Sequence, residues 1–184
     1  MNKIDIFIQQ YFYTARTPEL TQFFYSVTSL FDLTIYFVLF LMFVALVIYT
    51  VRNLKYAVFF LTTIAFGTGV VYVMKLFFNV NRPPEPVMFV FGQSFPSYHA
   101  TISVVFFILL MYVFDDYLRG VWRKIFNLFC LVSIFLVSLS RIYLGVHWFS
   151  DVFFGVFLGC LIVYLAIKIF KRVIIVQDEA SMLK

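Results

Sequence analysis

Long apolar runs without a charged residue occupy most of the sequence. Two of them, 33–51 and 56–74, contain 19 residues each, close to the roughly 20 residues with which a helix crosses a bilayer. Three shorter runs, 100–114, 125–140 and 152–167, contain 15 or 16 residues, so their helices must extend into the charged positions beside them. We therefore predict an all-α bundle over residues 33–170 with five membrane spans, at about 33–51, 54–80, 97–115, 120–142 and 146–170.

The first 31 residues have an amphipathic helical pattern instead. One apolar face follows i, i+3, i+4 spacing and consists of Ile4, Phe7, Ile8, Tyr11 and Phe12. Thr17 followed by Pro18 is typical of an N-cap and a first helical residue. The second apolar face then consists of Leu20, Phe23, Phe24, Val27 and Leu30. We predict that both helices of 1–31 lie in the membrane interface; a sixth span in this segment is the alternative.

The remaining segments are connections and a tail. Four of the five prolines fall within 81–96, which predicts one long irregular loop between the second and third spans. Residues 171–184 are polar and are predicted to form a tail. The chain contains no internal repeat, so we expect residues 1–184 to form a single membrane-embedded domain.

The composition excludes a soluble protein. Apolar residues (AVILMFWYC) make up 64% of the chain and charged residues 12%, against about 45–50% and 25% in soluble proteins. A soluble fold of 184 residues could not bury that much apolar surface. We therefore predict an integral membrane protein.

The positions of the positive charges predict its orientation. Nine of the 14 Lys and Arg residues follow the first, third and fifth spans, and the positive-inside rule places such connections in the cytoplasm. The C-terminus is then cytoplasmic and the loop 81–96 extracytoplasmic. This distribution accounts for the net charge of +5 without a nucleic-acid partner.

Three polar clusters lie at the predicted extracytoplasmic ends of the spans. They consist of Lys75 with Arg82 and Pro83, then Pro96-Ser97-Tyr98-His99, then Ser140-Arg141 with His147 and Asp151. Because these helix ends lie on one side of the bundle, we expect the clusters to converge on a shallow pocket at interfacial depth.

The cations of these clusters favour an anionic ligand. Lys75, Arg82 and Arg141 place three positive charges near lipid, where charges are costly and usually functional. An anion with two or more charges would offset their mutual repulsion. Arginine suits phosphate oxygens through its planar fork, and lysine adds a point charge. Ser97 is placed to cap the third span, whose N-terminus also favours an anion. The cluster therefore predicts a phosphate site.

The two histidines add reactive groups to that site. His147 and Asp151 are four residues apart, so on a helix they would share a face. A carboxylate bonded to one ring nitrogen fixes the tautomer and leaves the other nitrogen free to attack. His99, on a different helix, could then protonate the departing oxygen. These are the groups needed for phosphoryl transfer through a covalent intermediate.

The three clusters resemble the signature motifs of the type-2 phosphatidic acid phosphatase superfamily, whose members are mostly integral-membrane lipid phosphatases. Ten positions match in order and spacing: Lys75, Arg82, Pro83, Pro96, Ser97, His99, Ser140, Arg141, His147 and Asp151. The resemblance implies that His147 is the nucleophile, Asp151 orients it and His99 protonates the leaving group. It also implies phosphate binding by Lys75, Arg82, Ser97 and Arg141, with no metal or other cofactor.

One motif position differs from the usual pattern of the family. Tyr98 stands where the family usually has glycine. Its backbone N–H remains available to a phosphate, so we include Tyr98 among the phosphate-binding residues. Its bulky ring could narrow the pocket or contact the head group of the substrate.

The expected function is metal-independent hydrolysis of a lipid phosphate monoester or diphosphate at the extracytoplasmic face. The sequence does not choose among phosphatidic acid, phosphatidylglycerophosphate, a polyprenyl diphosphate and a lipid A phosphate. A lipid phosphotransferase with the same phosphohistidine and a non-catalytic anion-binding or transport protein are the alternatives. A zinc site of His99, His147 and Asp151 has suitable ligands, but the three cations disfavour it.

Gly155 and Gly159 continue the face of Asp151 in steps of four residues. Such a stripe permits close helix packing. We expect this packing inside the bundle, with a dimer seam as the alternative.

Overall fold

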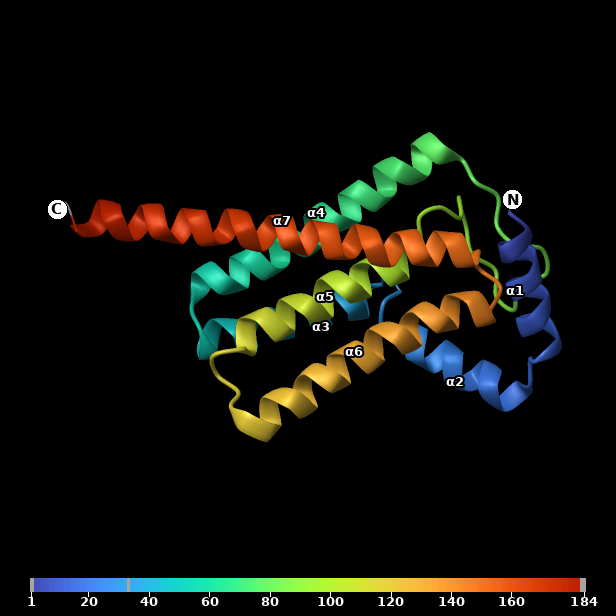
Figure 1. Ribbon diagram of the computed structural model, residues 1–184, viewed down its shortest axis with the longest axis horizontal. Coiled ribbons are helices and arrows are strands. Elements are labelled where there is room, and N and C mark those ends of the chain that lie inside the picture. The colour runs from blue at the N-terminus through green and yellow to red at the C-terminus, as the bar shows by residue number, and fades with distance from the viewer. Residues whose placement is uncertain (1, 33, 183–184) are drawn as a thin grey trace.

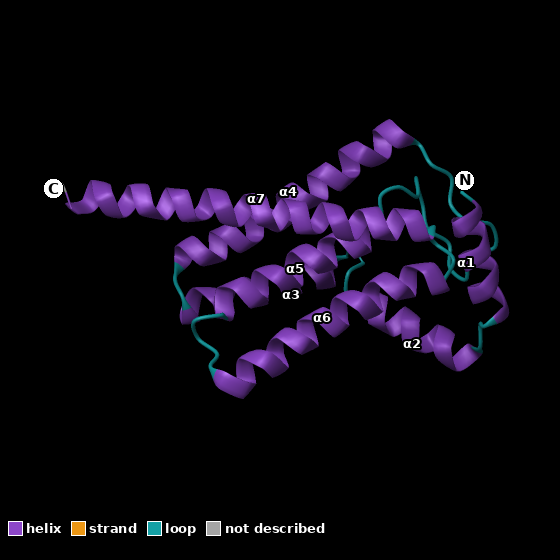
Figure 2. Cartoon of the chain, viewed as in Figure 1, coloured by secondary structure: helices purple, strands orange, loops and turns teal. Residues whose placement is uncertain are grey.

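The structure is a computed structural model that describes residues 2–32 and 34–182. The described residues form seven helices joined by loops (Figures 1 and 2). Their bounds are α1 Lys3–Thr14, α2 Pro18–Ser29, α3 Ile35–Val51, α4 Leu54–Phe78, α5 Tyr98–Phe114, α6 Gly120–Tyr143 and α7 Phe149–Met182. The predicted all-α fold is therefore confirmed for this part of the chain.

Each predicted span corresponds to one helix, α3 to α7 in order. Three of these helices are long and apolar enough to cross a membrane: α4, α6 and the segment Phe149–Ile175 of α7. The other two, α3 and α5, are apolar but have 17 residues each, or about 25 Å at 1.5 Å per residue. The protein is thus an integral membrane protein, and the number of five crossings stays a prediction.

The fifth predicted span and its helix differ in both bounds. Its helix begins at Phe149 and not at 146, because the chain turns at Gly145 with a φ of 69°, a backbone conformation that favours glycine. The helix also continues through Met182 and does not end at 170, since Lys and Arg are good helix formers. Residue 33 of the first predicted span and residues 183–184 of the predicted tail lie outside the described residues.

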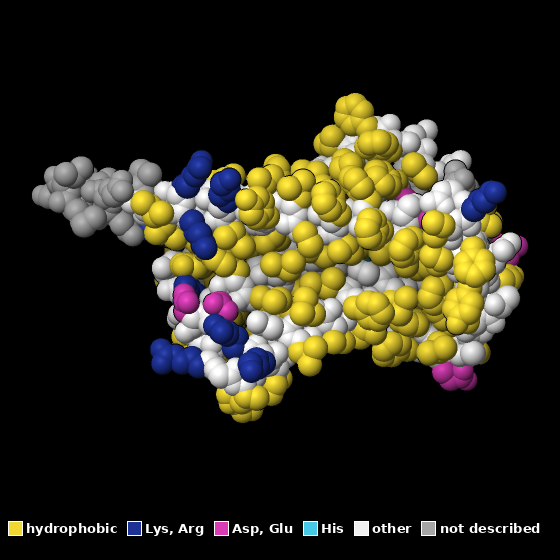
Figure 3. Space-filling model, in the orientation of Figure 1, with side chains coloured by type: hydrophobic (Ala, Val, Ile, Leu, Met, Phe, Trp, Pro, Cys, Tyr) yellow, Lys and Arg dark blue, Asp and Glu magenta, His cyan; other side chains and the backbone are white. Residues whose placement is uncertain are grey.

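The two N-terminal helices are confirmed, and the Thr17 side chain accepts the expected capping hydrogen bond from Leu20 N at 3.3 Å. Helix α1 packs its polar side against α6 and α7. Asp5 is only 4% exposed, whereas Phe7 is 71% exposed and Tyr11 63%. Apolar side chains also cover the middle of the molecule in Figure 3, with Lys and Arg gathered at the end where α7 leaves the bundle.

Helix α5 lies at the centre of the bundle and packs against α4, α6 and α7. The close approach of α7 to α5 depends on the glycines of α7. A Cβ atom at Gly159 would lie 2.7 Å from Val104 Cβ and 2.8 Å from Thr101 O, and one at Gly155 would lie 3.0 Å from Ser97 O. The expected packing of this stripe inside the bundle is confirmed. It places the start of α5 beside the start of α7.

Candidate active site

The connection between α6 and α7 carries His147 and is tied to the end of α6. The backbone N–H groups of Val146 and His147 both donate to Arg141 O, at 3.2 and 3.3 Å. His147 is 2% exposed and lies before α7, not on it as predicted. The turn at Gly145 therefore places His147 beside the first turn of α7, which carries Asp151.

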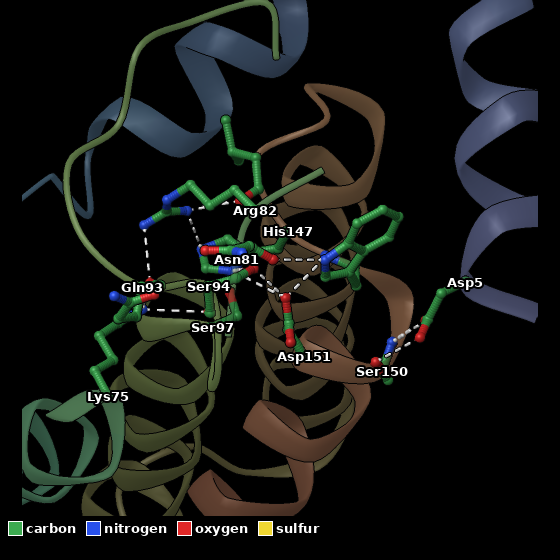
Figure 4. A network of polar contacts seen from close by, with 12 residues as sticks. Asp5, Lys75, Asn81, Arg82, Gln93, Ser94, Ser97, His147, Ser150 and Asp151 are labelled. Carbon is green, nitrogen blue, oxygen red and sulfur yellow. Dashed lines mark hydrogen bonds and ion pairs between the residues drawn. The ribbon is translucent and has the colours of Figure 1, made fainter. Parts of the chain in front are cut away.

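Asp151 and Ser94 face one side of the His147 ring (Figure 4). Asp151 Oδ2 lies 3.6 Å from His147 Nδ1, and Ser94 Oγ lies 3.4 Å from the same nitrogen. The Ser94 hydroxyl also donates to Asp151 Oδ2, which accepts from Trp148 N at 2.9 Å as well. Ser94 therefore bridges the predicted pair. Sequence reasoning missed it, although it stands only two residues before the Pro96-Ser97 motif.

Arg82 faces the other side of the ring. Its Nη1 atom lies 3.3 Å from His147 Nε2 and donates to Val146 O at 2.6 Å. Three carbonyls of its own loop, at Phe91, Gly92 and Gln93, accept from the rest of the guanidinium at 3.0–3.2 Å. The proline-rich loop thus wraps around Arg82 and fixes it against the imidazole.

Lys75 reaches the same loop from α4. Its Nζ donates to Gln93 O at 2.5 Å and to Ser94 O at 3.3 Å. Lys75 and Arg82 therefore meet at one carbonyl, that of Gln93, as Figure 4 shows. The predicted convergence of the first cluster with His147 is present in the structure.

Ser97 and Arg141 each carry a buried polar atom without a partner in the described part of the chain. Ser97 occupies the N-cap position of α5, but its side chain makes no capping hydrogen bond, and its Oγ atom is unpartnered. Arg141 is 1% exposed and its Nε atom is unpartnered. The predicted capping bond of Ser97 is thus wrong, and its hydroxyl is left for another acceptor or donor. Unpaired buried polar groups of this kind are costly, which fits a site built for a polar ligand.

His99 lies in the first turn of α5. Its Nε2 atom lies 2.9 Å from Asp32 Oδ1, an acid that the sequence reasoning did not single out. Tyr98 packs edge-on against His99, with ring centroids 5.6 Å apart, and its hydroxyl is buried without a partner in the described residues. The bulky ring that replaces the usual glycine therefore lies beside the predicted proton donor.

Residues from α1 and α2 also contact the site. Arg141 Nη1 donates to Thr28 Oγ1 at 2.7 Å. The carboxylate of Asp5 accepts from both the backbone N–H and the hydroxyl of Ser150, each at 2.9 Å, so it caps the first turn of α7 from another helix (Figure 4). These contacts join segments far apart in the sequence.

The electrostatic environment favours a neutral His147. Burial, followed by the positive charges of Arg141, Arg82 and Lys75, lowers the pKa of His147 below the ordinary value of an imidazole. A neutral ring keeps a lone pair on one nitrogen, which a nucleophile requires. Within residues 2–32 and 34–182, no three His, Cys, Asp or Glu side chains form a group that could hold a metal ion.

The sequence model of the PAP2 superfamily matches residues 56–175, which include all ten motif positions. The chain belongs to the PAP2 superfamily. The predicted resemblance to the type-2 phosphatidic acid phosphatases is confirmed. Asp5, Thr28 and Asp32 precede the matched region, so the part of the chain outside the PAP2 match also contacts the site. No curated protein matches the sequence.

Two solved structures share the PAP2 fold of this chain. A transmembrane PAP2-type phosphatidylglycerolphosphate phosphatase from Bacillus subtilis has a TM-score of 0.83 and 24% identity, over 91% of this chain and 85% of its own. Aquifex aeolicus LpxE has a TM-score of 0.67 and 23% identity, over 89% of this chain and 94% of its own. At these identities, the likeness establishes the fold.

Proposed function

We propose that this protein is a PAP2 membrane phosphatase that hydrolyses a lipid phosphate monoester or diphosphate through a phosphohistidine at His147. The observation that carries the proposal is the environment of the two ring nitrogens. Nδ1 faces the Asp151 carboxylate at 3.6 Å, and Nε2 faces the Arg82 guanidinium at 3.3 Å. The nitrogen beside the cation is the one at which a bound phosphate would meet the ring.

The reaction has two steps. In the first, His147 Nε2 forms a bond to phosphorus while the bond from phosphorus to the leaving oxygen breaks, and His99 gives that oxygen a proton. In the second, His99 takes a proton from water, the water oxygen bonds to phosphorus, and the N–P bond breaks. Lys75, Arg82 and Arg141 offset the negative charge that develops on the phosphoryl oxygens, with Ser97 and the backbone N–H of Tyr98 as neutral donors.

One of the two structural neighbours acts on a lipid phosphate. The B. subtilis protein is a phosphatidylglycerolphosphate phosphatase, and its fold is shared over most of this chain. We extend that substrate class, a lipid phosphate, to this protein. A site at one end of an apolar bundle lets the lipid tail stay in the bilayer while the head group reaches His147.

A phosphate-release panel tests the proposal. Purified protein is given phosphatidic acid, phosphatidylglycerophosphate, a polyprenyl diphosphate, a lipid A phosphate and water-soluble phosphoesters. We expect free phosphate from at least one lipid and none from His147→Ala, with Asp115→Asn at the other end of the bundle as an unaffected control. Lipid binding without phosphate release would contradict the proposal, and a phosphorylated acceptor in place of free phosphate would indicate a phosphotransferase.

The same proposal places the site on the extracytoplasmic side, with the C-terminus in the cytoplasm. Its support is the positive-inside rule, because Arg119 before α6 and Arg123 and Lys124 at the start of α6 lie at the opposite end of the bundle from the site. In a chain without its two native cysteines, Phe91→Cys should react with an impermeant thiol reagent added to intact cells. Arg119→Cys should react only after permeabilisation. The reverse result would invert the topology.

A further inference from the structure

The contact between Asp32 and His99 brings an acid from outside the PAP2 match to the predicted proton donor. Asp32 lies in the connection between α2 and α3, and its Oδ1 atom is 2.9 Å from His99 Nε2. The two residues are 67 positions apart. The contact therefore depends on how the N-terminal segment is folded onto α5.

Packing holds this connection in place. Phe31, the residue before Asp32, is 1% exposed. Its ring contacts those of Phe106 and Phe107 in α5 and that of Phe37 in α3, at centroid distances of 5.7–5.9 Å. Since Phe31 is fixed in the core between α3 and α5, its neighbour has little freedom to leave the imidazole.

The charges around His99 explain what a carboxylate does there. Three charged groups act on the ring: Asp32 from the α2–α3 connection, Arg141 from α6 and Arg82 from the proline-rich loop. Both arginines repel an imidazolium, and Asp32 is the acid in this set. A carboxylate on one ring nitrogen stabilises the imidazolium and fixes the direction of the other nitrogen.

We propose that Asp32 is a positioning residue that holds His99 as the proton donor for the leaving group. The inference rests on the proposed phosphatase function. Asp32 keeps its hydrogen bond to Nε2–H, and the proton on Nδ1 passes to the leaving oxygen as the O–P bond breaks. The N-terminal segment thereby takes part in the departure of the lipid alcohol, through a residue that the family motifs do not include.

Leaving-group dependence tests the inference. Two phosphate monoesters with the same alkyl chain are compared, one with an alkoxide leaving group and one with a nitrophenolate that can depart without a proton. We expect Asp32→Asn to lower kcat/KM for the alkyl ester by about 100-fold, in the range of general acid catalysis, and to leave the nitroaryl ester nearly unchanged. His99→Gln should give the same selective loss of kcat/KM, because this ratio covers the steps up to formation of the phosphohistidine and not the later proton transfer from water to His99. Asp32→Glu should recover part of kcat/KM on the alkyl ester.

The matched control is Glu19→Gln, which removes a surface acid of α2 and should change neither substrate. Retained activity of Asp32→Asn on the nitroaryl ester also shows that this variant is folded. Equal losses on the two esters, or no loss on either, would overturn the inference. If the unchanged chain releases phosphate from neither ester nor from any lipid of the panel, the proposed function itself fails.

Discussion

Nη1 of Arg141 donates a 2.7 Å hydrogen bond to Oγ1 of Thr28, which lies 113 positions earlier in the chain. Both side chains are buried. The guanidinium is thus held by α2 on one side, while its Nε atom has no partner in the described residues. Helix α2 therefore helps to hold Arg141, which is predicted to bind phosphate, in addition to any contact that α2 makes with the membrane.

Thr28→Val should weaken substrate binding. The substitution keeps the shape of the side chain but leaves a buried guanidinium N–H without an acceptor, and a hydrogen bond to a charged group contributes about 1.5–3 kcal/mol. We expect KM to rise about tenfold or more on that scale, measured as phosphate release. Thr28→Ser retains the hydroxyl and should stay close to the unchanged protein. Equal KM values for both variants would show that Thr28 does not position Arg141.

Gly159→Ala should destabilise the bundle and lower activity. The added methyl would meet Val104 Cβ at 2.7 Å and Thr101 O at 2.8 Å, so α7 must move away from α5, and with it Asp151. Overpacking of this kind costs about 1–3 kcal/mol. The matched control is Gly69→Ala in α4, where an added Cβ would meet no atom within 4 Å. Thermal unfolding in detergent should show a lower Tm for Gly159→Ala only; unchanged stability would contradict the observed packing.

Arg82→Gln should move the acidic limb of the kcat/KM profile to higher pH. The charge of Arg82 is one of the causes that lower the pKa of His147, so its removal raises that pKa. More of His147, the proposed nucleophile, is then protonated at a given acidic pH. Each variant and the unchanged protein are assayed with the same substrate. Ionisation of the substrate's phosphate then affects all the pH profiles equally. Arg123→Gln, at the other end of the bundle, should not move the limb; a shift to lower pH in Arg82→Gln would contradict the assignment.

Phosphate release should persist in EDTA. In the proposed mechanism, Lys75, Arg82 and Arg141 supply the positive charge that a metal ion would otherwise provide to the phosphoryl oxygens. The measurement is the initial rate before and after dialysis against the chelator. Loss of activity that added divalent cations restore would mean that the proposed mechanism is incomplete.

The helices and the site residues near them were largely predictable from the sequence. Apolar runs indicate where α3 to α7 lie because a segment in lipid must pair its backbone polar groups within its own helix and present apolar side chains to the bilayer. The motif residues could be grouped because they stand at the ends of predicted spans. Lys75, Arg82, His147 and Asp151 do meet in the structure, through the Gln93 carbonyl and the Ser94 hydroxyl.

The supporting residues could not be predicted in the same way. Asp5, Thr28 and Asp32 lie in or beside amphipathic helices, where a polar residue ordinarily faces water. Their contacts with Ser150, Arg141 and His99 depend on how α1 and α2 dock onto the bundle, which no local pattern specifies. The bounds of α7 were mistaken for a related reason. The turn at Gly145 is not marked by a change in hydrophobicity, and α7 continues as a helix past residue 170 although the sequence becomes more polar there.

The phosphorylated state of His147 tests the central claim most directly. The protein is mixed with a ³²P-labelled substrate of the release panel, quenched within the first turnover under alkaline conditions that preserve phosphohistidine, and digested for peptide mapping. The account predicts acid-labile label on the peptide that contains His147, and none in His147→Gln. Label on another residue, or steady turnover with no labelled peptide, would contradict it.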